Sequence, residues 1–315
     1  MWDFHTHVIP PEVVEAARLG RYGLQVQDDR LMVGKDQVMI GQMNDLQILE
    51  NYADDRGLSL VLSVPPALFR HDLSGVESVS WCVFLNNAMM DVLQGGRQCR
   101  KGLATLPMAE TADALAEWGR VGNEFIGIAM GTTVQGTTMD ADALLPFWQG
   151  FAVQGGGLCF VHAVDSCNVQ PQRYYLNNLL EYPHEDARAT ASLLFSGLPV
   201  RFSNIYWLIS HGGGAAAFLL SRWQRGYETA RPGIDINLPG PQKVFRSLWF
   251  DSVLHDAEAL EYLMRKAPGH VVYGTDYPFP MGTQHRPISP LVKSDQILEV
   301  NGNQLMELLI KGRTP

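Results

Sequence analysis

Eight short apolar segments recur along the chain, and each is followed by a stretch with helical periodicity. The first predicted strand begins at residue 2 and ends before Pro10-Pro11; the others are Leu58–Pro65, Leu103–Pro107, Phe125–Met130, Gly157–His162, Ile205–His211, Ser247–Asp251 and His270–Asp276. Apolar strands that alternate with helices are typical of a parallel sheet with both faces covered. Eight such units in 315 residues favour a closed (β/α)8 TIM-like barrel, with an open doubly wound sheet as the alternative.

One stretch near the amino end departs from this alternation. Between residues 22 and 39, two short alternating runs flank Asp28-Asp29, a pair typical of a hairpin turn. We therefore predict a small β insertion at 22–39, after the first strand-helix unit and within a single domain of residues 1–315. At the other end, we expect two short helices, Ser294–Val300 and Gln304–Ile310.

Charge and composition exclude several classes of function. The net charge of −9 argues against nucleic acid or an anionic membrane surface as a partner. No apolar run approaches the roughly 20 residues that span a bilayer, and a strand that begins at residue 2 leaves no room for a signal peptide. The four cysteines have neither metal-binding nor disulfide spacing. We therefore expect a cytoplasmic protein that acts on a small molecule.

Polar side chains occur at the carboxyl ends of the predicted strands. His5 and His7 are two residues apart on the first strand, so their side chains point to the same face. His162, His211 and Asp276 end the fifth, sixth and eighth strands. In a barrel these ends meet at one mouth, and imidazoles and carboxylates are costly to bury there unless they are paired or bind a metal.

We assign His5, His7, His162 and Asp276 as ligands of one divalent metal. Zinc is the first choice for this ligand set, and Mn(II), Fe(II) and Co(II) are alternatives. His211 then remains as a general acid or base, because the ordinary pKa of histidine lies near neutrality.

Other residues near the predicted mouth have two interpretations. Gly212-Gly213-Gly214 either lets the backbone approach a ligand or forms an ordinary strand-helix turn. Asp251, at the end of the seventh strand, is a candidate to orient a histidine or an arginine. The side chains interpreted as barrel core are Trp207, Trp249 and Phe160. The histidines interpreted as solvated or locally hydrogen-bonded are His71, His184, His255, His270 and His285.

Four motifs resemble a known family: Asp3–His7, Phe160–His162, Ser210–Gly214 and Tyr273–Pro280. In this order they are similar to the amidohydrolase-2 group of the amidohydrolase superfamily, and within it to aminocarboxymuconate semialdehyde decarboxylases and related aromatic acid decarboxylases. The resemblance implies a distorted (β/α)8 barrel with one divalent metal, and it matches the ligand and acid-base assignments made above.

The resemblance also implies a homodimer. Phe218–Arg222 matches a segment in which the family decarboxylase places an arginine across the dimer interface onto a substrate carboxylate. From the residues alone, Arg222 is interpreted first as a surface or interface arginine, with carboxylate recognition as the alternative. Two features depart from the family pattern: Ala163 stands where proline is common, and a second substrate arginine has only Arg30 and Lys35 as candidates.

The expected function is a metal-dependent, non-oxidative decarboxylase of an aromatic or muconate-type carboxylic acid. In this reading His211 and Asp276 are catalytic and Arg222 binds the substrate. A metal-dependent hydrolase of an amide, lactone or ester, or a hydratase, would use nearly the same site atoms. A non-catalytic metal-binding scaffold would have no need of a proton-transferring His211.

Overall fold

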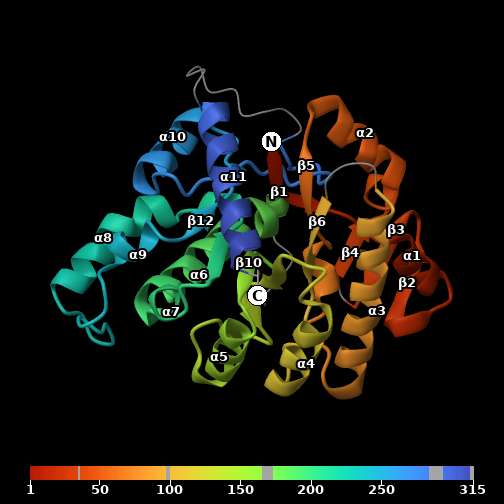
Figure 1. Ribbon diagram of the computed structural model, residues 1–315, viewed down its shortest axis with the longest axis horizontal. Coiled ribbons are helices and arrows are strands. Elements are labelled where there is room, and N and C mark those ends of the chain that lie inside the picture. The colour runs from red at the N-terminus through yellow and green to blue at the C-terminus, as the bar shows by residue number, and fades with distance from the viewer. Residues whose placement is uncertain (35, 97–99, 165–172, 284–293, 313–315) are drawn as a thin grey trace.

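The computed structural model describes residues 1–34, 36–96, 100–164, 173–283 and 294–312. A seven-stranded sheet lies at the centre, with the strand order β1-β5-β6-β7-β10-β11-β12 (Figure 1). All neighbouring strands are parallel, as predicted. The strands are β1 (Trp2–His7), β5 (Ser59–Ser63), β6 (Arg100–Ala104), β7 (Gly127–Gly131), β10 (Gly157–His162), β11 (Ile205–Ile209) and β12 (Trp249–Phe250).

The predicted eighth strand, His270–Asp276, is wrong as a regular strand. In place of a regular ladder, it has isolated bridges of Val271 with Phe250 on one side and of Tyr277 with Thr6 on the other, together with scattered backbone hydrogen bonds to β12 and β1. These two bridges place it between β12 and β1. The barrel prediction is therefore confirmed, with a closing segment in place of the last strand.

The closing segment has a local reason for its irregular pairing. The hydroxyl group of Ser252 donates to the carbonyl oxygen of Gly274 and accepts from its N–H, at 3.2 and 3.1 Å. A side chain thus occupies the place that a neighbouring backbone would take in a regular ladder. Asp276 then adopts a φ of 57°, which lies outside the extended region.

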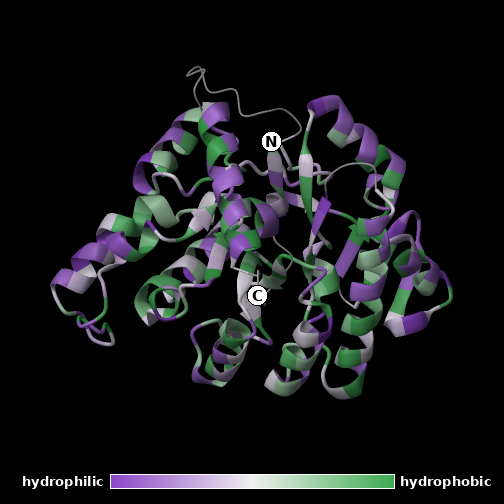
Figure 2. Ribbon diagram, in the orientation of Figure 1, coloured by the Kyte–Doolittle hydropathy of each residue, from purple (hydrophilic) through white to green (hydrophobic). Residues whose placement is uncertain are grey.

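Helices surround the sheet, and Figure 2 shows both hydrophilic and hydrophobic residues along them, as expected for helices with one face on a core. Trp207, Trp249 and Phe160 are buried in that core, as predicted. In the described part of the chain, no helix combines the length and apolar character needed to cross a membrane. The helices are α1 (Pro11–Arg18), α2 (Leu46–Arg56), α3 (Gly75–Gln94), α4 (Thr111–Val121), α5 (Leu145–Val153), α6 (Tyr182–Ser196), α7 (Leu198–Arg201), α8 (Ala216–Glu228), α9 (Pro241–Phe245), α10 (Ala257–Lys266) and α11 (Ser294–Lys311).

The β insertion is confirmed, and it contains one strand more than predicted. β2 (Leu24–Gln27), β3 (Arg30–Val33) and β4 (Asp36–Met39) form an antiparallel sheet. Asp28 and Asp29 join β2 to β3 with φ values of 47° and 59°, the backbone that a two-residue hairpin loop requires. That this insertion belongs to a single domain of residues 1–315 stays a prediction.

At the other end of the chain, α11 replaces the two short helices that were predicted. The side chain of Asn301 donates a hydrogen bond to the carbonyl oxygen of Val271, at 2.8 Å. Gly302 lies against Phe4 of β1, where a Cβ atom would be 3.3 Å from the ring. These contacts with the sheet hold residues of low helix propensity inside one continuous helix.

The connections contain short elements as well. They are the 3-10 helices η1 (Arg21–Gly23), η2 (Gly41–Met43), η3 (Pro66–Phe69), η4 (Asp142–Leu144), η5 (Arg173–Tyr175) and η7 (His211–Gly213), the π-helix η6 (Asn177–Glu181), and the hairpin strands β8 (Thr133–Val134) and β9 (Thr137–Thr138). Of the four cysteines, Cys82 and Cys159 are buried and free, and the other two lie outside the described residues.

Candidate metal centre

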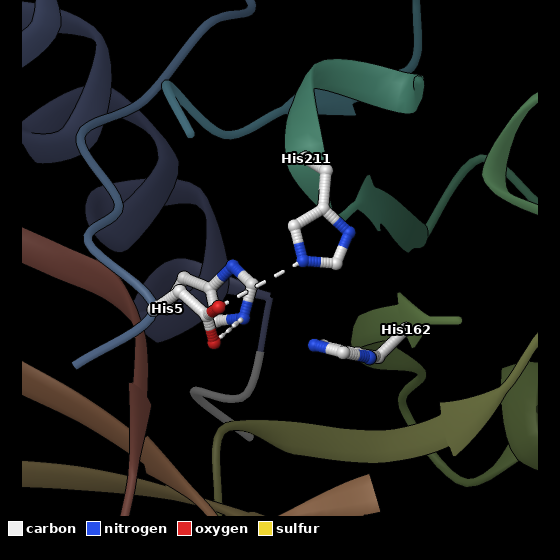
Figure 3. A group of neighbouring side chains, drawn as sticks. His5, His162 and His211 are labelled. Carbon is white, nitrogen blue, oxygen red and sulfur yellow. Dashed lines mark ion pairs between the residues drawn. The ribbon is translucent and has the colours of Figure 1, made fainter. Parts of the chain in front are cut away.

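The five polar residues predicted at the strand ends lie together at one edge of the sheet. His5 and His7 come from β1, His162 ends β10, His211 begins η7 directly after β11, and Asp276 belongs to the closing segment. One ligand atom each of His5, His162, His211 and Asp276 lies within 4.8 Å of the others. Figure 3 shows the three imidazoles turned toward one another from separate elements.

His7 joins this cluster through its Nε2 atom. That atom lies 3.1 Å from Nε2 of His5, and each of the two nitrogens lies 3.2 Å from Oδ1 of Asp276. On the other side, Nε2 of His211 is 4.0 Å from Oδ2 of the same carboxylate. The structure therefore brings together all five residues, which we call the metal cluster.

Each imidazole of the metal cluster is held from outside through Nδ1. His5 contacts the carboxylate of Asp251 at 2.6 Å, and His211 contacts that of Asp186 at 2.8 Å. His162 contacts the carbonyl oxygen of Ala163 at 2.7 Å. His7 contacts the carbonyl oxygen of Val64 at 3.3 Å and the hydroxyl of Ser63 at 3.1 Å. Carbonyl and ionised carboxylate oxygens only accept hydrogen bonds, so Nδ1 carries the proton in every ring. When it is neutral, each ring directs an Nε2 lone pair at the common centre.

This arrangement fits a divalent metal ion. Nε2 of His162 is buried and has no hydrogen-bond partner among the described residues, and the Nε2 atoms of His5 and His7 lie 3.1 Å apart, so that two lone pairs face each other when both rings are neutral. Buried polar atoms without partners are costly. A cation between them would satisfy all of them, and an Nδ1–H bonded to a carboxylate or carbonyl is typical of histidines that bind metals.

The charges around the centre favour the same conclusion. Burial lowers the pKa of His5, but the carboxylates of Asp276 and Asp251 outweigh it and raise the pKa above its usual value. Burial lowers the pKa of His162 well below its usual value, so that ring stays neutral. Despite burial, His5 and His7 hold the pKa of Asp276 well below the usual range. The carboxylates therefore stabilise one positive charge at the centre, which His5 carries as a proton when no metal is bound, and the neutral His162 offers its Nε2 lone pair.

Asp251 orients a histidine, as the sequence indicated. Besides His5 Nδ1, its carboxylate accepts the backbone N–H groups of His211, Gly212 and Val253, at 3.0, 2.9 and 3.1 Å. The glycine turn after β11 is thereby bound to the same carboxylate that orients His5.

Asp186 is a site residue that sequence reasoning missed. It lies in α6, is fully buried, and accepts from His211 Nδ1 and from the hydroxyl of Ser210 at 2.9 Å. Burial lowers the pKa of His211, but Asp186 outweighs it and raises that pKa. The His211 side chain is 17% exposed, whereas those of His5 and His7 are 0% exposed. Of these three rings, His211 is thus the most accessible to solvent.

A cavity of about 830 Å³ opens beside the metal cluster, lined by His162, His211 and Asp276 among others. Residues of β3, β4 and the loop between them form part of its wall, so the insertion contributes to the pocket. Arg70 is the sole arginine or lysine among the described lining residues. Arg30 and Arg222 are exposed and do not line it, and Lys35 lies outside the described residues.

His71 also lines this cavity, and its ring accepts a hydrogen bond from the N–H of Gly131, 60 residues later, so the expected local hydrogen bond is not the one it makes. The position of His71 in the sequence could have indicated that it lies at the barrel mouth. It follows β5 and η3, at the carboxyl end of a strand, where the loops of a barrel form the mouth. His285, interpreted in the same way, lies outside the described residues.

Comparisons with known proteins agree with this geometry. The sequence pattern of a family described as amidohydrolase matches residues 2–298. The 2-amino-3-carboxymuconate-6-semialdehyde decarboxylase of Dictyostelium discoideum is 30% identical over 298 residues, which is 89% of this chain and 82% of that protein.

Two solved structures show a similar fold. The 5-carboxyvanillate decarboxylase of Sphingomonas paucimobilis superposes with a TM-score of 0.77 at 19% identity, covering 98% of each chain. The dihydroxybenzoic acid decarboxylase of Polaromonas sp. JS666, with bound manganese and the inhibitor 2-nitroresorcinol, has a TM-score of 0.73 at 14% identity. That comparison covers 99% of this chain and 97% of the other.

Proposed function

The chain belongs to the amidohydrolase family, and from that premise we propose that it is a metal-dependent, non-oxidative decarboxylase of an aromatic or muconate-type carboxylic acid. The observation that carries this proposal is the convergence of four imidazole Nε2 atoms and one carboxylate beside a cavity of about 830 Å³. Similarity to the Dictyostelium decarboxylase over most of both chains supports decarboxylation in particular.

His5, His7, His162 and Asp276 would hold one divalent ion. Zinc is our assignment for this ligand set, with manganese, iron and cobalt as alternatives. Manganese in the Polaromonas structure supports a divalent ion in this fold. When bound, the ion supplies a Lewis acid that polarises substrate oxygens and offsets their negative charge.

His211 is the proposed acid, because it combines access to the cavity with a raised pKa. Asp186 holds its Nδ1–H, so the proton that leaves is the one on Nε2. Transfer of that proton to the substrate carbon that bears the carboxylate interrupts conjugation. The bond from this carbon to the carboxylate then breaks, its electron pair restores the conjugated system, and CO2 leaves. His211 regains a proton from solvent through Asp276, whose Oδ2 lies 4.0 Å from His211 Nε2.

We further propose that two copies associate and that Arg222 binds the substrate carboxylate in the partner's cavity. Arg222 is exposed on α8 and does not line the cavity of its own chain. Phe218, one turn earlier on the same helix, is 67% exposed, which is unusual for a phenylalanine and supports a covered face. Arg222→Ala and His211→Asn should each lack turnover alone. When the two variants are mixed, turnover should return, because a mixed dimer has one cavity with an intact His211 and an Arg222 from the partner.

The test of the proposed reaction uses the purified, metal-loaded protein and a panel of aromatic and muconate-type carboxylic acids. We expect CO2 release with loss of one carboxyl group and about one divalent ion per chain by elemental analysis. His211→Asn should keep the ion and lose at least about 100-fold in rate.

Other outcomes would contradict the proposal. Ring opening or amine release without CO2 would favour the hydrolase alternative, which the description of the matching family keeps in view. Activity that is indifferent to chelators, in a protein without bound metal, would overturn the metal assignment.

A further inference from the structure

His71 occupies a wall of the cavity that the proposed chemistry does not use. It follows η3 and lines the same cavity as His162, His211 and Asp276. Arg70, directly before it, adopts left-handed backbone angles of φ 47° and ψ 44°, which cost a non-glycine residue about 1 kcal/mol or more. This reversal sends the chain from η3 toward β7, where His71 meets the backbone.

The hydrogen bond between His71 and Gly131 determines which ring nitrogen of His71 carries the proton. The backbone N–H of Gly131 donates to His71 Nε2 at 3.2 Å. Gly131 is the last residue of β7 and pairs with His162 in the sheet, so the position of this N–H is set by the barrel. A ring nitrogen that accepts a hydrogen bond carries no proton, so the proton of the neutral ring is on Nδ1.

The Nδ1–H group remains available to a ligand. The Gly131 contact is the sole hydrogen bond of His71 to any described residue. Burial lowers the pKa of His71 to about 4, an effect that Asp72 opposes in part. The ring is therefore neutral near pH 7 and offers one donor, without a charge.

The surrounding charges select the kind of acceptor. Arg70 gives its guanidinium to Asp72, at 3.0 to 3.3 Å, and to the carbonyl oxygen of Tyr22, at 3.1 Å. The one cation on the described wall is thus already paired, and the carboxylates of Asp36 and Asp72 line the same cavity. A second carboxylate on the substrate would find no uncompensated positive charge on this wall.

We propose that His71 determines specificity by donating its Nδ1–H to an uncharged oxygen of the substrate, such as a hydroxyl, methoxy or carbonyl group on the ring. This inference rests on the proposed function for its substrate class, an aromatic acid. It names the group that distinguishes one such acid from another. β7 and β10 are neighbours, about 4.8 Å apart, so His71 is anchored one strand away from His162. Because His71, His162, His211 and Asp276 line one cavity, a substrate that is bound at the metal cluster and fills this cavity would meet His71.

The chain offers a matched pair of variants for the test. In His71→Asn, the side-chain amide can place a donor where Nδ1 lies, but the variant loses the acceptor for Gly131. In His71→Gln, the amide oxygen can still accept from Gly131, but no donor remains at the Nδ1 position. The first variant keeps the proposed function of His71 and the second keeps its structural contact.

The probes are pairs of 2-hydroxybenzoates that carry either a hydroxyl or a methyl group at ring position 4 or 5. Dissociation constants are measured by calorimetry on the metal-loaded protein at pH 7. In at least one pair, the wild-type protein should prefer the hydroxyl compound by about tenfold, the effect of one neutral hydrogen bond. His71→Asn should retain this preference and His71→Gln should lose it.

Three results would overturn the inference. One is equal binding of hydroxyl and methyl compounds by the wild-type protein, and another is an equal loss of affinity for both compounds in His71→Gln, which indicates a structural role alone. The third is tighter binding of 4-carboxy-2-hydroxybenzoate than of the 4-hydroxy compound, which would assign a charged acceptor. CO2 release is measured separately. A His71-dependent preference without CO2 release would refute the proposed function and leave this inference standing.

Discussion

Replacing Asp251 with asparagine tests whether one buried carboxylate holds the metal centre together. Its two oxygens accept four N–H groups: those of His5 and His211 on Oδ2, and those of Gly212 and Val253 on Oδ1. An asparagine amide has one oxygen and one NH2 group, so in either orientation two of the four donors face another donor. The perturbation therefore removes two hydrogen bonds and leaves the number of heavy atoms unchanged.

The magnitude follows from those two bonds. A hydrogen bond to a charged group contributes about 1.5–3 kcal/mol, so the free energy of unfolding of the metal-free protein should fall by about 3–6 kcal/mol in Asp251→Asn. Because Asp251 also orients His5, metal affinity should fall by about 10- to 100-fold. Urea unfolding after chelation measures the first quantity, and competition with a chromophoric chelator measures the second.

Asp256→Asn is the matched control for Asp251→Asn. Asp256 caps α10 from an exposed position, with Oδ1 2.7 Å from the N–H of Ala259. Asparagine caps helices as well as aspartate does, so the same chemical change there should alter stability by less than about 0.5 kcal/mol. The reasoning fails if Asp251→Asn stays within about 1 kcal/mol of the wild-type stability and within about threefold of its metal affinity.

Three further predictions concern packing, pH and metal removal. A Cβ atom at Gly127 would lie 1.9 Å from the carbonyl oxygen of Leu158 on the adjacent strand. The free energy of unfolding of Gly127→Ala should therefore be lower by more than about 4 kcal/mol, or the variant should fail to fold. Gly119→Ala is the control, because its Cβ atom would be 3.6 Å from the nearest atom, and it should show no such loss. Since burial lowers the pKa of His71 from 6.5 to about 4, the unfolded chain binds a proton between these values that the folded protein does not. The free energy of unfolding should therefore decrease as the pH falls through that range, and the decrease, followed by urea titration, should be smaller in His71→Gln. Chelation should lower the free energy of unfolding by about 2.7 kcal/mol relative to protein in metal at 100 times its Kd; unchanged thermal unfolding would contradict a resident metal.

The sequence predicted the barrel and the position of the metal cluster for one physical reason. Strand side chains alternate between faces, and the carboxyl ends of parallel strands share an edge, so residues such as His5, His162 and His211 can be placed by counting along apolar segments. Local turn chemistry was equally informative, since Asp28-Asp29 gave the hairpin its position.

What the sequence did not reveal depends on contacts between distant segments. Asp186 lies within a helix, and nothing in its neighbours indicates that it bonds to His211, 25 residues later. The continuity of α11 is likewise set by what Asn301 and Gly302 touch on the sheet, against their own helix propensity. His71 is an intermediate case, because its loop could be placed at the mouth while its contact with Gly131 could not.

The closure of the barrel also has a consequence for folding during synthesis on the ribosome. The hydroxyl of Thr275 donates to Asp3, 272 residues earlier in the chain, at 2.6 Å. Synthesis proceeds at about 5–20 residues per second, so β1 leaves the ribosome roughly 14–54 s before the segment that completes its pairing. During that interval one edge of β1 has no partner strand, and His5 and His7 have no Asp276. A nascent chain that ends before residue 276 lacks the carboxylate of the metal cluster, so we expect the cluster to be completed only late in synthesis.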